Sequence, residues 1–499
     1  MAQTMPAPAP ERGTDLRRGA IGLREVLFQS ITHMAPAAAV AFSIPFGGPF
    51  AAGALPLAVI LAMVACLLVA ISIGQLAKQL PSAGSFYTYA ARGLHPSIGF
   101  LVAWGYAFVE PMVAPLLYLI LGVTVAGTLN AEFGWSADLW WIWALVGAAV
   151  VFLLGYLGIQ VSTRTGTLLG IFEVGVFAAL GVWLIVEAGD RNNVEVFGTT
   201  FATAEGFTGF SGVFAGSIYT ILAFIGFEAA APLAEEAANP RRDVQRAVVG
   251  SALLIGLFYV LTTYGATVFF GPEKMATFNE SGGGNPWDGL ARAVWGAGWV
   301  LVFLAIANSA IANSNAGANA ATRTWYAMGR IRLLPSMFAS VHPRWRSPYV
   351  GVIAQLIVGV GLSLWLGFQF DPLTAFGFIA TILVIVVILI YMVVNLSCIA
   401  FYWRFRKDQA NVVLHGVIPI LGIAAFIPAF LTASGIAVFD FIGRLDHPLS
   451  LAGLIAGIWM VIGLLYLLYL QARAPQRVRD TGRIFIEEEP LVDAAVQEP

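Results

Sequence analysis

Long stretches without a charged residue alternate with short charged segments along most of the chain. A helix that crosses the hydrocarbon core of a bilayer needs about 20 predominantly apolar residues. The runs 93–131, 165–186 and 206–234 contain single glutamates, and uncharged runs of sufficient length occupy 26–77, 139–163, 247–272, 293–322, 347–370, 372–403, 409–439 and 447–472. Because the first run has room for two crossings around Gly47 and Pro49, the pattern predicts an all-α membrane protein with twelve transmembrane helices.

The scarcity and placement of charge predict the orientation of these helices. Only 11% of the 499 residues are charged, whereas about a quarter are charged in a soluble domain. With both termini in the cytoplasm, just four of the 26 Lys and Arg residues fall in outer segments, namely Arg191, Lys274, Arg292 and Arg444. Positive charge accumulates in cytoplasmic loops. The sequence therefore predicts a multi-pass protein of the inner (cytoplasmic) membrane, surrounded by lipid, with both termini cytoplasmic.

Several classes of function are disfavoured. Residues 1–19 lack the apolar core of a cleavable signal, so the first helix is expected to remain in the membrane. Cys66 and Cys398 both fall within predicted helices and imply neither a disulfide nor a thiolate metal site. The sequence has no Walker A loop, HExxH or nucleophile elbow, and its net charge of −2 offers no basic face for nucleic acid. We expect a transporter or channel rather than an enzyme, without cofactor, metal or nucleic-acid partner.

Ionisable side chains inside predicted helices are the first candidates for function. Glu110, Glu173 and Glu228 lie in the third, fifth and sixth helices. A charge in hydrocarbon is costly and usually faces a cavity or a partner, so each can bind a cationic amine, carry a coupled proton, or serve as a structural glutamate at a helix end. His33 in the first helix is a fourth candidate, since imidazole exchanges protons near neutral pH. A packing role for His33 is the alternative.

Breaks in two helices point to the same region. Pro36 removes a backbone donor near the middle of the first helix, and Gly226 and Pro232 interrupt the sixth. Interrupted helices at equivalent places in two halves of a chain are typical of a transporter's binding site. Helices one and six are separated by five positions in the helix order, which favours an inverted repeat of five helices. Unwound backbone offers N–H groups to a carboxylate and carbonyls to an ammonium.

Three motifs, in order, resemble the amino acid, polyamine and organocation (APC) permease superfamily. The first is Pro81-Ser-Ala-Gly-Ser-Phe-Tyr-Thr-Tyr-Ala-Ala-Arg, similar to P-x-A-G-S-x-Y-T-Y-x-x-R. The second joins Gly226-Phe-Glu to Glu235-Glu-Ala-Ala-Asn-Pro-Arg-Arg, similar to G-F-E and E-E-x-x-N-P-x-R. The third includes Thr322-Arg-Thr-Trp-Tyr-Ala-Met-Gly-Arg after the eighth helix. The resemblance covers residues 21–405.

The resemblance implies a LeuT-like 5+5 inverted-repeat bundle with broken helices 1 and 6 and two extra C-terminal helices. The expected segments are a cytoplasmic tail 1–23, a first repeat 24–189, a second repeat 206–405, helices 11 and 12 within 409–472, and a cytoplasmic tail 473–499. Substrate would bind at the two breaks, with the ring of Phe224 or Phe227 as a cover, and Glu110 matches an acidic position of cationic amino acid carriers. The implied substrate-binding residues are Ser30, Ile31, Thr32, His33, Met34, Ala35, Glu110, Ala223, Phe224, Ile225, Gly226 and Phe227.

The sequence departs from the superfamily pattern at three places. The glycine-rich break of the first helix is replaced by Thr32-His-Met-Ala-Pro-Ala, which places side chains where the backbone usually approaches the substrate. Glu173 falls where many proton-dependent relatives have a lysine. Asn315 and Asn319 lie one turn apart on the same face of the eighth helix. They form either a polar lattice near the site or contacts between helices.

The leading hypothesis is a secondary active amino acid permease that works by alternating access with a coupling proton. Glu173, Glu228 and His33 are the candidate proton carriers. The scarcity of acidic groups favours a neutral or aromatic amino acid, whereas Glu110 favours a polyamine or another organic cation. Sodium coupling remains an alternative to proton coupling, and an inorganic ion carrier or channel remains an alternative of a different class.

Overall fold

The computed structural model describes residues 21–482 except 83 and 440, and describes the backbone alone at 159–166, 235, 283 and 482. Most of the two predicted tails, 1–20 and 483–499, lies outside the described residues. The described chain is almost entirely helical, with one two-stranded antiparallel ribbon of β1 (Thr203–Ala204) and β2 (Phe207–Thr208).

The helices follow one another with short connections. In chain order the α-helices are α1 Leu23–His33, α2 Pro36–Ala38, α3 Gly48–Ala51, α4 Leu55–Gln79, α5 Ser85–Gly93, α6 Pro96–Phe133, α7 Trp140–Leu157, α8 Ile159–Ala188, α9 Phe210–Phe224, α10 Pro240–Phe270, α11 Ser281–Gly284, α12 Pro286–Trp295, α13 Trp299–Arg330, α14 Tyr349–Phe370, α15 Pro372–Phe405, α16 Ile418–Ala433, α17 Ala452–Arg473 and α18 Pro475–Arg479. Shorter 3-10 or π segments are η1 Ala39–Ser43, η2 Pro45–Gly47, η3 Ala52–Ala54, η4 Ala137–Leu139, η5 Gly189–Arg191, η6 Val194–Phe197, η7 Phe227–Glu235, η8 Pro272–Glu280, η9 Gly296–Gly298, η10 Ser336–Ala339, η11 Lys407–Gln409, η12 Val413–Val417, η13 Leu449–Leu451 and η14 Asp480–Gly482.

The number of membrane-spanning helices agrees with the prediction. Within the described residues, eleven helices are long and apolar enough to cross a membrane, and the number is twelve when the bent pair Phe210–Phe224 and Phe227–Ala234 counts as one span. The pair bends by 40°. The first span, Leu23–Ser43, combines α1, α2 and η1. The predicted all-α membrane fold is confirmed.

Both predicted breaks are present, and local backbone chemistry explains them. Helix α1 ends at His33, Ala35 adopts a left-handed conformation with φ of 46°, and Pro36 begins α2. Proline suits this first position because its missing N–H would have no helical partner there. Helix α9 ends at Phe224, and Gly226 has φ of 116° before η7 begins. Glycine is the residue that adopts such a φ without strain.

The turn between the fourth and fifth helices lies inside the uncharged run 139–163. Gly158, with φ of 98°, separates α7 from α8. A positive φ at glycine ends a helix regardless of the apolar residues that follow. Helix α7 therefore ends at Leu157, and α8 begins at Ile159.

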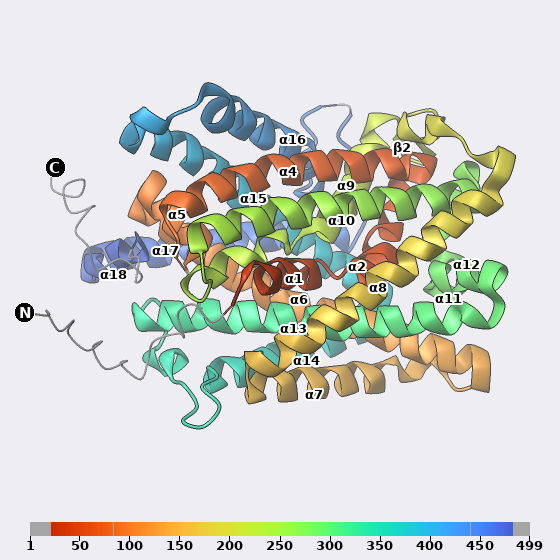
Figure 1. Ribbon diagram of the computed structural model, residues 1–499, viewed down its shortest axis with the longest axis horizontal. Coiled ribbons are helices and arrows are strands. Elements are labelled where there is room, and N and C mark those ends of the chain that lie inside the picture. The colour runs from red at the N-terminus through yellow and green to blue at the C-terminus, as the bar shows by residue number, and fades with distance from the viewer. Residues whose placement is uncertain (1–20, 83, 440, 483–499) are drawn as a thin grey trace, which may run out of the picture.

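Two groups of helices surround the breaks. Helix α1 packs on α10, α8, η7 and α13, whereas α6 packs on α13, α15, α7 and α14. Figure 1 shows α4 and α10 running side by side along the molecule, with α8 crossing α10 and α13 diagonally. Helix α13 belongs to both groups, since it contacts α1 as well as α6.

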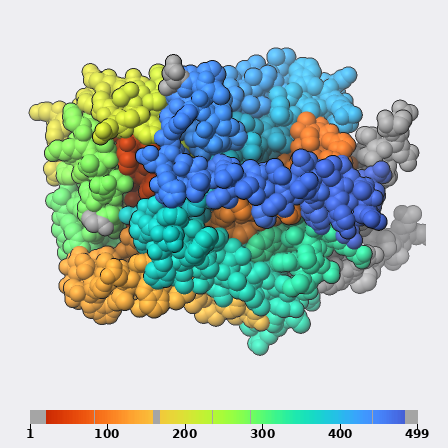
Figure 2. Space-filling model, turned by 180° about the vertical axis from the view of Figure 1, so that it is seen from behind, coloured from red at the N-terminus to blue at the C-terminus, as the bar shows by residue number. Residues whose placement is uncertain are grey.

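The last span is attached to α6 by a reciprocal pair of tryptophans. Trp104 Nε1 donates to the Trp459 carbonyl at 3.0 Å, and Trp459 Nε1 donates to the Trp104 carbonyl at 3.1 Å. The rings stack with centroids 4.7 Å apart. Figure 2 shows α17, in dark blue, running across the face of the molecule opposite the view of Figure 1. Helix α17 thus covers α6 from outside the bundle.

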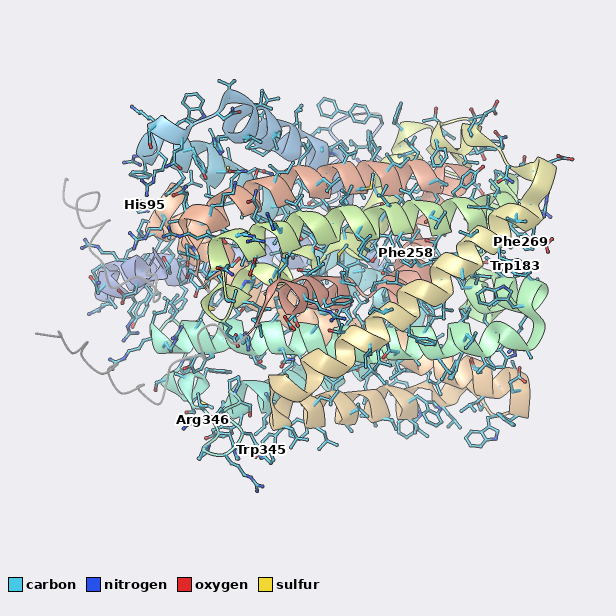
Figure 3. All side chains as sticks on the ribbon, in the orientation of Figure 1. His95, Trp183, Phe258, Phe269, Trp345 and Arg346 are labelled. Carbon is cyan, nitrogen blue, oxygen red and sulfur yellow. The ribbon has the colours of Figure 1, made fainter. Side chains whose placement is uncertain are left out.

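The two ends of the described chain lie at one end of the bundle. Ile21 pairs with Ala237, and η14 contacts α5. Figure 3 places Trp345 and Arg346 toward this end and Phe269 at the far end of α10. The predicted basic loop between α13 and α14 therefore shares a side with both chain ends.

Candidate functional site

The two helix breaks touch through Gly226 and His33. A Cβ added to Gly226 would lie 2.6 Å from the His33 carbonyl carbon. Ser30 strengthens this contact, because its hydroxyl donates to the Phe227 carbonyl at 2.8 Å and accepts from the Ala230 N–H at 3.1 Å. The end of α1 and the start of η7 are therefore joined by hydrogen bonds that use backbone groups freed by the second break.

A tyrosine from a third helix reaches both breaks. Tyr259 of α10 is fully buried, and its hydroxyl lies 2.8 Å from the Met34 carbonyl and 2.9 Å from the Ala223 carbonyl, donating toward each. These carbonyls precede the two irregular segments and need partners outside their own helices. Sequence reasoning missed Tyr259, since a tyrosine in an apolar helix gives no signal of the side that it faces.

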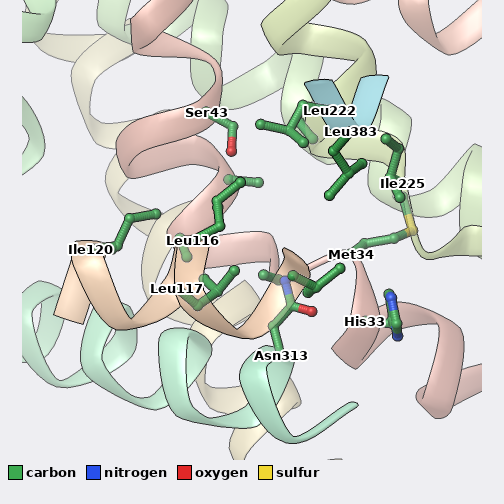
Figure 4. Close-up of a pocket in the computed structure, with 15 residues that line it drawn as sticks. His33, Met34, Ser43, Leu116, Leu117, Ile120, Leu222, Ile225, Asn313 and Leu383 are labelled. Carbon is green, nitrogen blue, oxygen red and sulfur yellow. The ribbon is translucent and has the colours of Figure 1, made fainter. Parts of the chain in front are cut away.

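A cavity adjoins the breaks. It measures about 420 Å³ including the part open to solvent. Figure 4 shows Met34 and His33 at one side of it, Asn313 below, and Leu116, Leu117 and Ile120 opposite. Its lining comes from the breaks and from α2, η1, α6, α9, α13 and α15, and comprises His33, Met34, Ala35, Ala38, Ala39, Ser43, Val113, Leu116, Leu117, Ile120, Leu222, Ala223, Ile225, Asn313 and Leu383.

The lining is largely apolar and contains no Asp, Glu, Lys or Arg among the described residues. The exceptions to its apolar character are His33, Ser43 and Asn313. Asn313 is buried, and its Oδ1 has no hydrogen-bond partner among the residues that the structure describes. Sequence reasoning singled out Asn315 and Asn319 on this helix but not Asn313. Ser309 lies one turn before Asn313 and accepts a hydrogen bond from the Ala38 N–H at 3.2 Å, which shows that this face of α13 is turned toward the first span.

Four of the predicted residues of the first span lie at the site in different ways. His33, Met34 and Ala35 line the cavity, whereas Ser30 joins the two breaks. Ile31 is buried and does not line the cavity. Thr32 lies on the side of α8, where a Cβ at Gly170 would meet its hydroxyl at 3.9 Å.

The predicted residues of the sixth span divide in the same manner. Ala223 and Ile225 line the cavity, and Gly226 packs on His33. Phe224 and Phe227 are fully buried and do not line it. The Phe224 ring packs edge-on against Tyr259 with centroids 5.3 Å apart, and the Phe227 ring packs against Tyr391 at 5.5 Å. Both rings thus support the break from behind in this conformation.

Two of the three intramembrane glutamates converge behind His33. His33 Nε2 lies 3.8 Å from Glu110 Oε2, and both side chains are 2% exposed. The Tyr106 hydroxyl faces Glu110, and Glu228 is close enough to interact with it electrostatically. We call His33, Glu110, Glu228 and Tyr106 the acidic cluster. His33 lines the cavity, whereas neither carboxylate of the cluster does.

Glu228 is held by the second break itself. The Gly226 N–H donates to Glu228 Oε2 at 3.0 Å, and the Tyr391 hydroxyl lies beside the carboxylate. An N–H at the start of a helical segment stabilises a carboxylate by hydrogen bonding and through the helix dipole. Glu110 Oε2 and His33 Nδ1 have no hydrogen-bond partner, which leaves the cluster with unused donors and acceptors.

Glu173 lies apart from this cluster. It is 1% exposed and faces the Ser309 hydroxyl and the Ala37 N–H across the first span. Neither carboxylate oxygen makes a hydrogen bond of ordinary geometry. Unpartnered carboxylates are rare in membrane interiors and mark ion or proton pathways. The structure thus places Glu173 on one side of the first span and the acidic cluster on another.

The predicted polar face of the eighth span does not reach the cavity. Asn315 is buried with an unpartnered Oδ1, and neither it nor Asn319 lines the space beside the breaks. Asn319 lines a second space of about 270 Å³ between α6, α7, α13 and α14, together with Gln355. Among the described residues, no group of three or more His, Cys, Asp or Glu side chains is arranged to hold a metal ion.

Similarity to known proteins identifies the family of this chain. The model of the family described as amino acid permease matches residues 25–478. A low-affinity putrescine importer, PlaP of Escherichia coli, is 26% identical over 426 residues, which cover 83% of this chain and 85% of the importer. A branched-chain amino acid permease, BcaP of Bacillus subtilis, is 26% identical over 326 residues, 61% of this chain and 66% of the permease.

A solved structure supports the fold. The crystal structure of a manganese transporter mutant from Eremococcus coleocola superposes with a TM-score of 0.53 at 15% identity, covering 92% of this chain and 94% of that one. At this identity the likeness concerns the fold alone. The family match extends over both breaks, the cavity and the acidic cluster. The chain belongs to the amino acid permease family of the APC superfamily.

Proposed function

We propose that this protein carries a neutral amino acid with an apolar side chain across the inner membrane, by alternating access coupled to protons. The observation that supports the proposal is the cavity beside the joined breaks, because the described residues that line it include no Asp, Glu, Lys or Arg and a single titratable histidine. The backbone at the breaks suits the carboxylate and ammonium of the substrate. The side chain would lie among Leu116, Leu117, Ile120 and Leu383.

Glu173 is the proposed proton carrier. Its oxygens have no hydrogen-bond partner, and it faces the segment that follows the first break. A proton neutralises a carboxylate that lacks a partner in a buried site. Protonation at Glu173 would thereby be linked to the position of the first span relative to α8 and α13. The predicted repeats 24–189 and 206–405 would rock against each other during this cycle.

Uptake into proteoliposomes tests the proposal. We expect saturable uptake of radiolabelled leucine that is stimulated by an inward proton gradient, abolished by a protonophore, and inhibited by apolar amino acids. A sodium gradient of the same size should have no effect. A linear ion flux without competition by amino acids would instead identify a channel, and stimulation by sodium alone would remove the proton from the mechanism.

An organic amine is the second candidate substrate. The acidic cluster supports it, because Glu110 and Glu228 supply two buried carboxylates within reach of the break if His33 moves aside. Buried carboxylates pair strongly with ammonium groups. Competition of leucine uptake by putrescine distinguishes the two candidates: inhibition by putrescine and not by leucine analogues favours the amine.

The membrane orientation is proposed from the distribution of charge. The 22 Lys and Arg residues assigned to the cytoplasmic side outnumber the four assigned outside, which favours cytoplasmic termini. Fusion of a periplasm-active reporter to the C-terminus should give no signal in bacteria, whereas fusion of a cytoplasm-active reporter should give one. The opposite pattern would invert the topology.

A further inference from the structure

Helix α6 carries two prolines that each remove one backbone hydrogen bond. Pro111 and Pro115 lie within the helix, next to Glu110. Proline has no N–H, so the carbonyl four residues earlier loses its helical partner. The two affected carbonyls belong to Ala107 and to Pro111 itself. A carbonyl without a partner inside a membrane protein is unfavourable, and another donor must satisfy it.

Two side chains from neighbouring helices supply these donors. Trp325 Nε1 of α13 donates to the Ala107 carbonyl at 3.1 Å. Gln355 Nε2 of α14 donates to the Pro111 carbonyl at 2.9 Å. Gln355 is 2% exposed, so its amide is withdrawn from water to make this bond. Each proline of α6 is therefore matched by one donor, and the two donors come from different helices.

Glu110 lies between the two satisfied carbonyls in the sequence. Its side chain reaches His33 of the first span, whereas the donors approach from α13 and α14. Helix α6 is thus held on one side while it contacts the broken helix on another. We propose that Trp325 and Gln355 are positioning residues that fix this stretch of α6 and so hold the Glu110 carboxylate at the break.

This inference rests on the second candidate substrate under the proposed function, an amine that meets the acidic cluster. It adds that the selectivity for amines depends on hydrogen bonds made outside the site. Neither Trp325 nor Gln355 lines the cavity beside the breaks. Their effect must therefore pass through the backbone of α6.

Variants that remove only the donor test the idea. Trp325→Phe keeps an aromatic ring without the N–H, and Gln355→Met keeps the length of the side chain without the amide. We expect each to raise the KM for radiolabelled putrescine, or its inhibition constant against leucine, about tenfold, the factor that corresponds to one buried hydrogen bond. The kcat for leucine should change by less than about twofold.

The prolines provide a rescue that a merely structural role would not predict. Pro111→Ala restores the N–H that bonds the Ala107 carbonyl, so Trp325→Phe should have little effect in that background. Pro115→Ala should likewise make Gln355→Met neutral. Trp403→Phe is the matched control, since its indole donates to the His415 carbonyl at 3.1 Å, away from α6. It should leave the KM for putrescine unchanged.

A measurement without transport separates this inference from the proposed function. Trp325→Phe and Glu110→Gln should change the melting temperature of the purified protein non-additively, and Trp403→Phe and Glu110→Gln additively. The wild-type protein could transport neither leucine nor putrescine while the Trp325→Phe and Glu110→Gln effects on the melting temperature are non-additive. In that case the proposed function fails and the positioning role remains. Equal losses for leucine and putrescine, no rescue by the alanine variants, or an additive cycle would each overturn the positioning role.

Discussion

Gly226 lies against the His33 backbone so closely that a methyl group at position 226 would come within 2.7 Å of the His33 carbonyl oxygen. The backbone at position 226 also has a φ of 116°, a conformation that glycine adopts readily and residues with a Cβ do not. These two requirements explain why the Gly-Phe-Glu sequence occurs at this break: glycine permits the contact, and Glu228 then receives the Gly226 N–H.

We expect Gly226→Ala to abolish uptake and to lower the free energy of unfolding by about 2–4 kcal/mol, because the methyl group would clash with His33 and strain the backbone. Uptake in proteoliposomes and thermal unfolding in detergent measure the two effects. Gly361→Ala is the control, since a Cβ there meets no atom within 4 Å. Normal uptake by Gly226→Ala would show that the breaks do not need to touch.

Tyr259→Phe should destabilise the protein by about 1–3 kcal/mol, because it leaves a buried carbonyl at a break without its donor. The rate of transport should fall as well, since the two breaks lose the hydroxyl that binds a carbonyl of each. Tyr264→Phe on the same helix is the matched control: its hydroxyl binds Asn192 at 3.1 Å at an exposed site. Equal effects of the two variants would contradict a special role for Tyr259.

Glu173→Gln should abolish uptake driven by a pH gradient but retain exchange of internal for external substrate, because exchange needs no net proton movement. Counterflow and gradient-driven uptake in the same proteoliposomes measure the two modes. Glu187→Gln serves as the control, since Glu187 is exposed on the same helix. Full gradient-driven activity of Glu173→Gln would exclude this residue as the proton carrier.

Glu110→Gln should weaken inhibition by putrescine at least about tenfold while the KM for leucine stays within a factor of about two, because the amide keeps the shape of the side chain and loses the charge. Competition assays with both compounds provide the measurement. Loss of leucine uptake and unchanged inhibition by putrescine would place Glu110 in the amino acid site instead.

Much of the fold was predictable because membranes impose simple rules on sequence. Uncharged runs of sufficient length gave the spans, and Pro36 and Gly226 gave the breaks. The uncharged run 139–163 did not show where the fourth helix ends, because apolar composition continues past Gly158 while its backbone conformation ends the helix. Hydropathy predicts which segments lie in the bilayer, but it carries no information on the backbone φ angle that ends a helix.

The site was less predictable than the fold. Each intramembrane glutamate was recognisable alone, but sequence did not show that Glu110 and Glu228 converge while Glu173 lies elsewhere. That division depends on how α6 crosses the break. Tyr259 and Asn313 were not predicted for a related reason. Tyr259 binds the first break and Asn313 lines the cavity because α10 and α13 turn these side chains toward the site, and neighbouring residues do not indicate that direction.

The position of the Tyr259 hydroxyl has a consequence for the energetics of binding. A phenol has one proton, so it satisfies either the Met34 carbonyl or the Ala223 carbonyl at a given moment. The other carbonyl keeps a free lone pair toward its neighbours. An arriving ammonium would donate to this free lone pair and let the tyrosine proton stay on the other carbonyl. The empty transporter would then alternate between two hydrogen-bond patterns, whereas the loaded one would hold a single pattern.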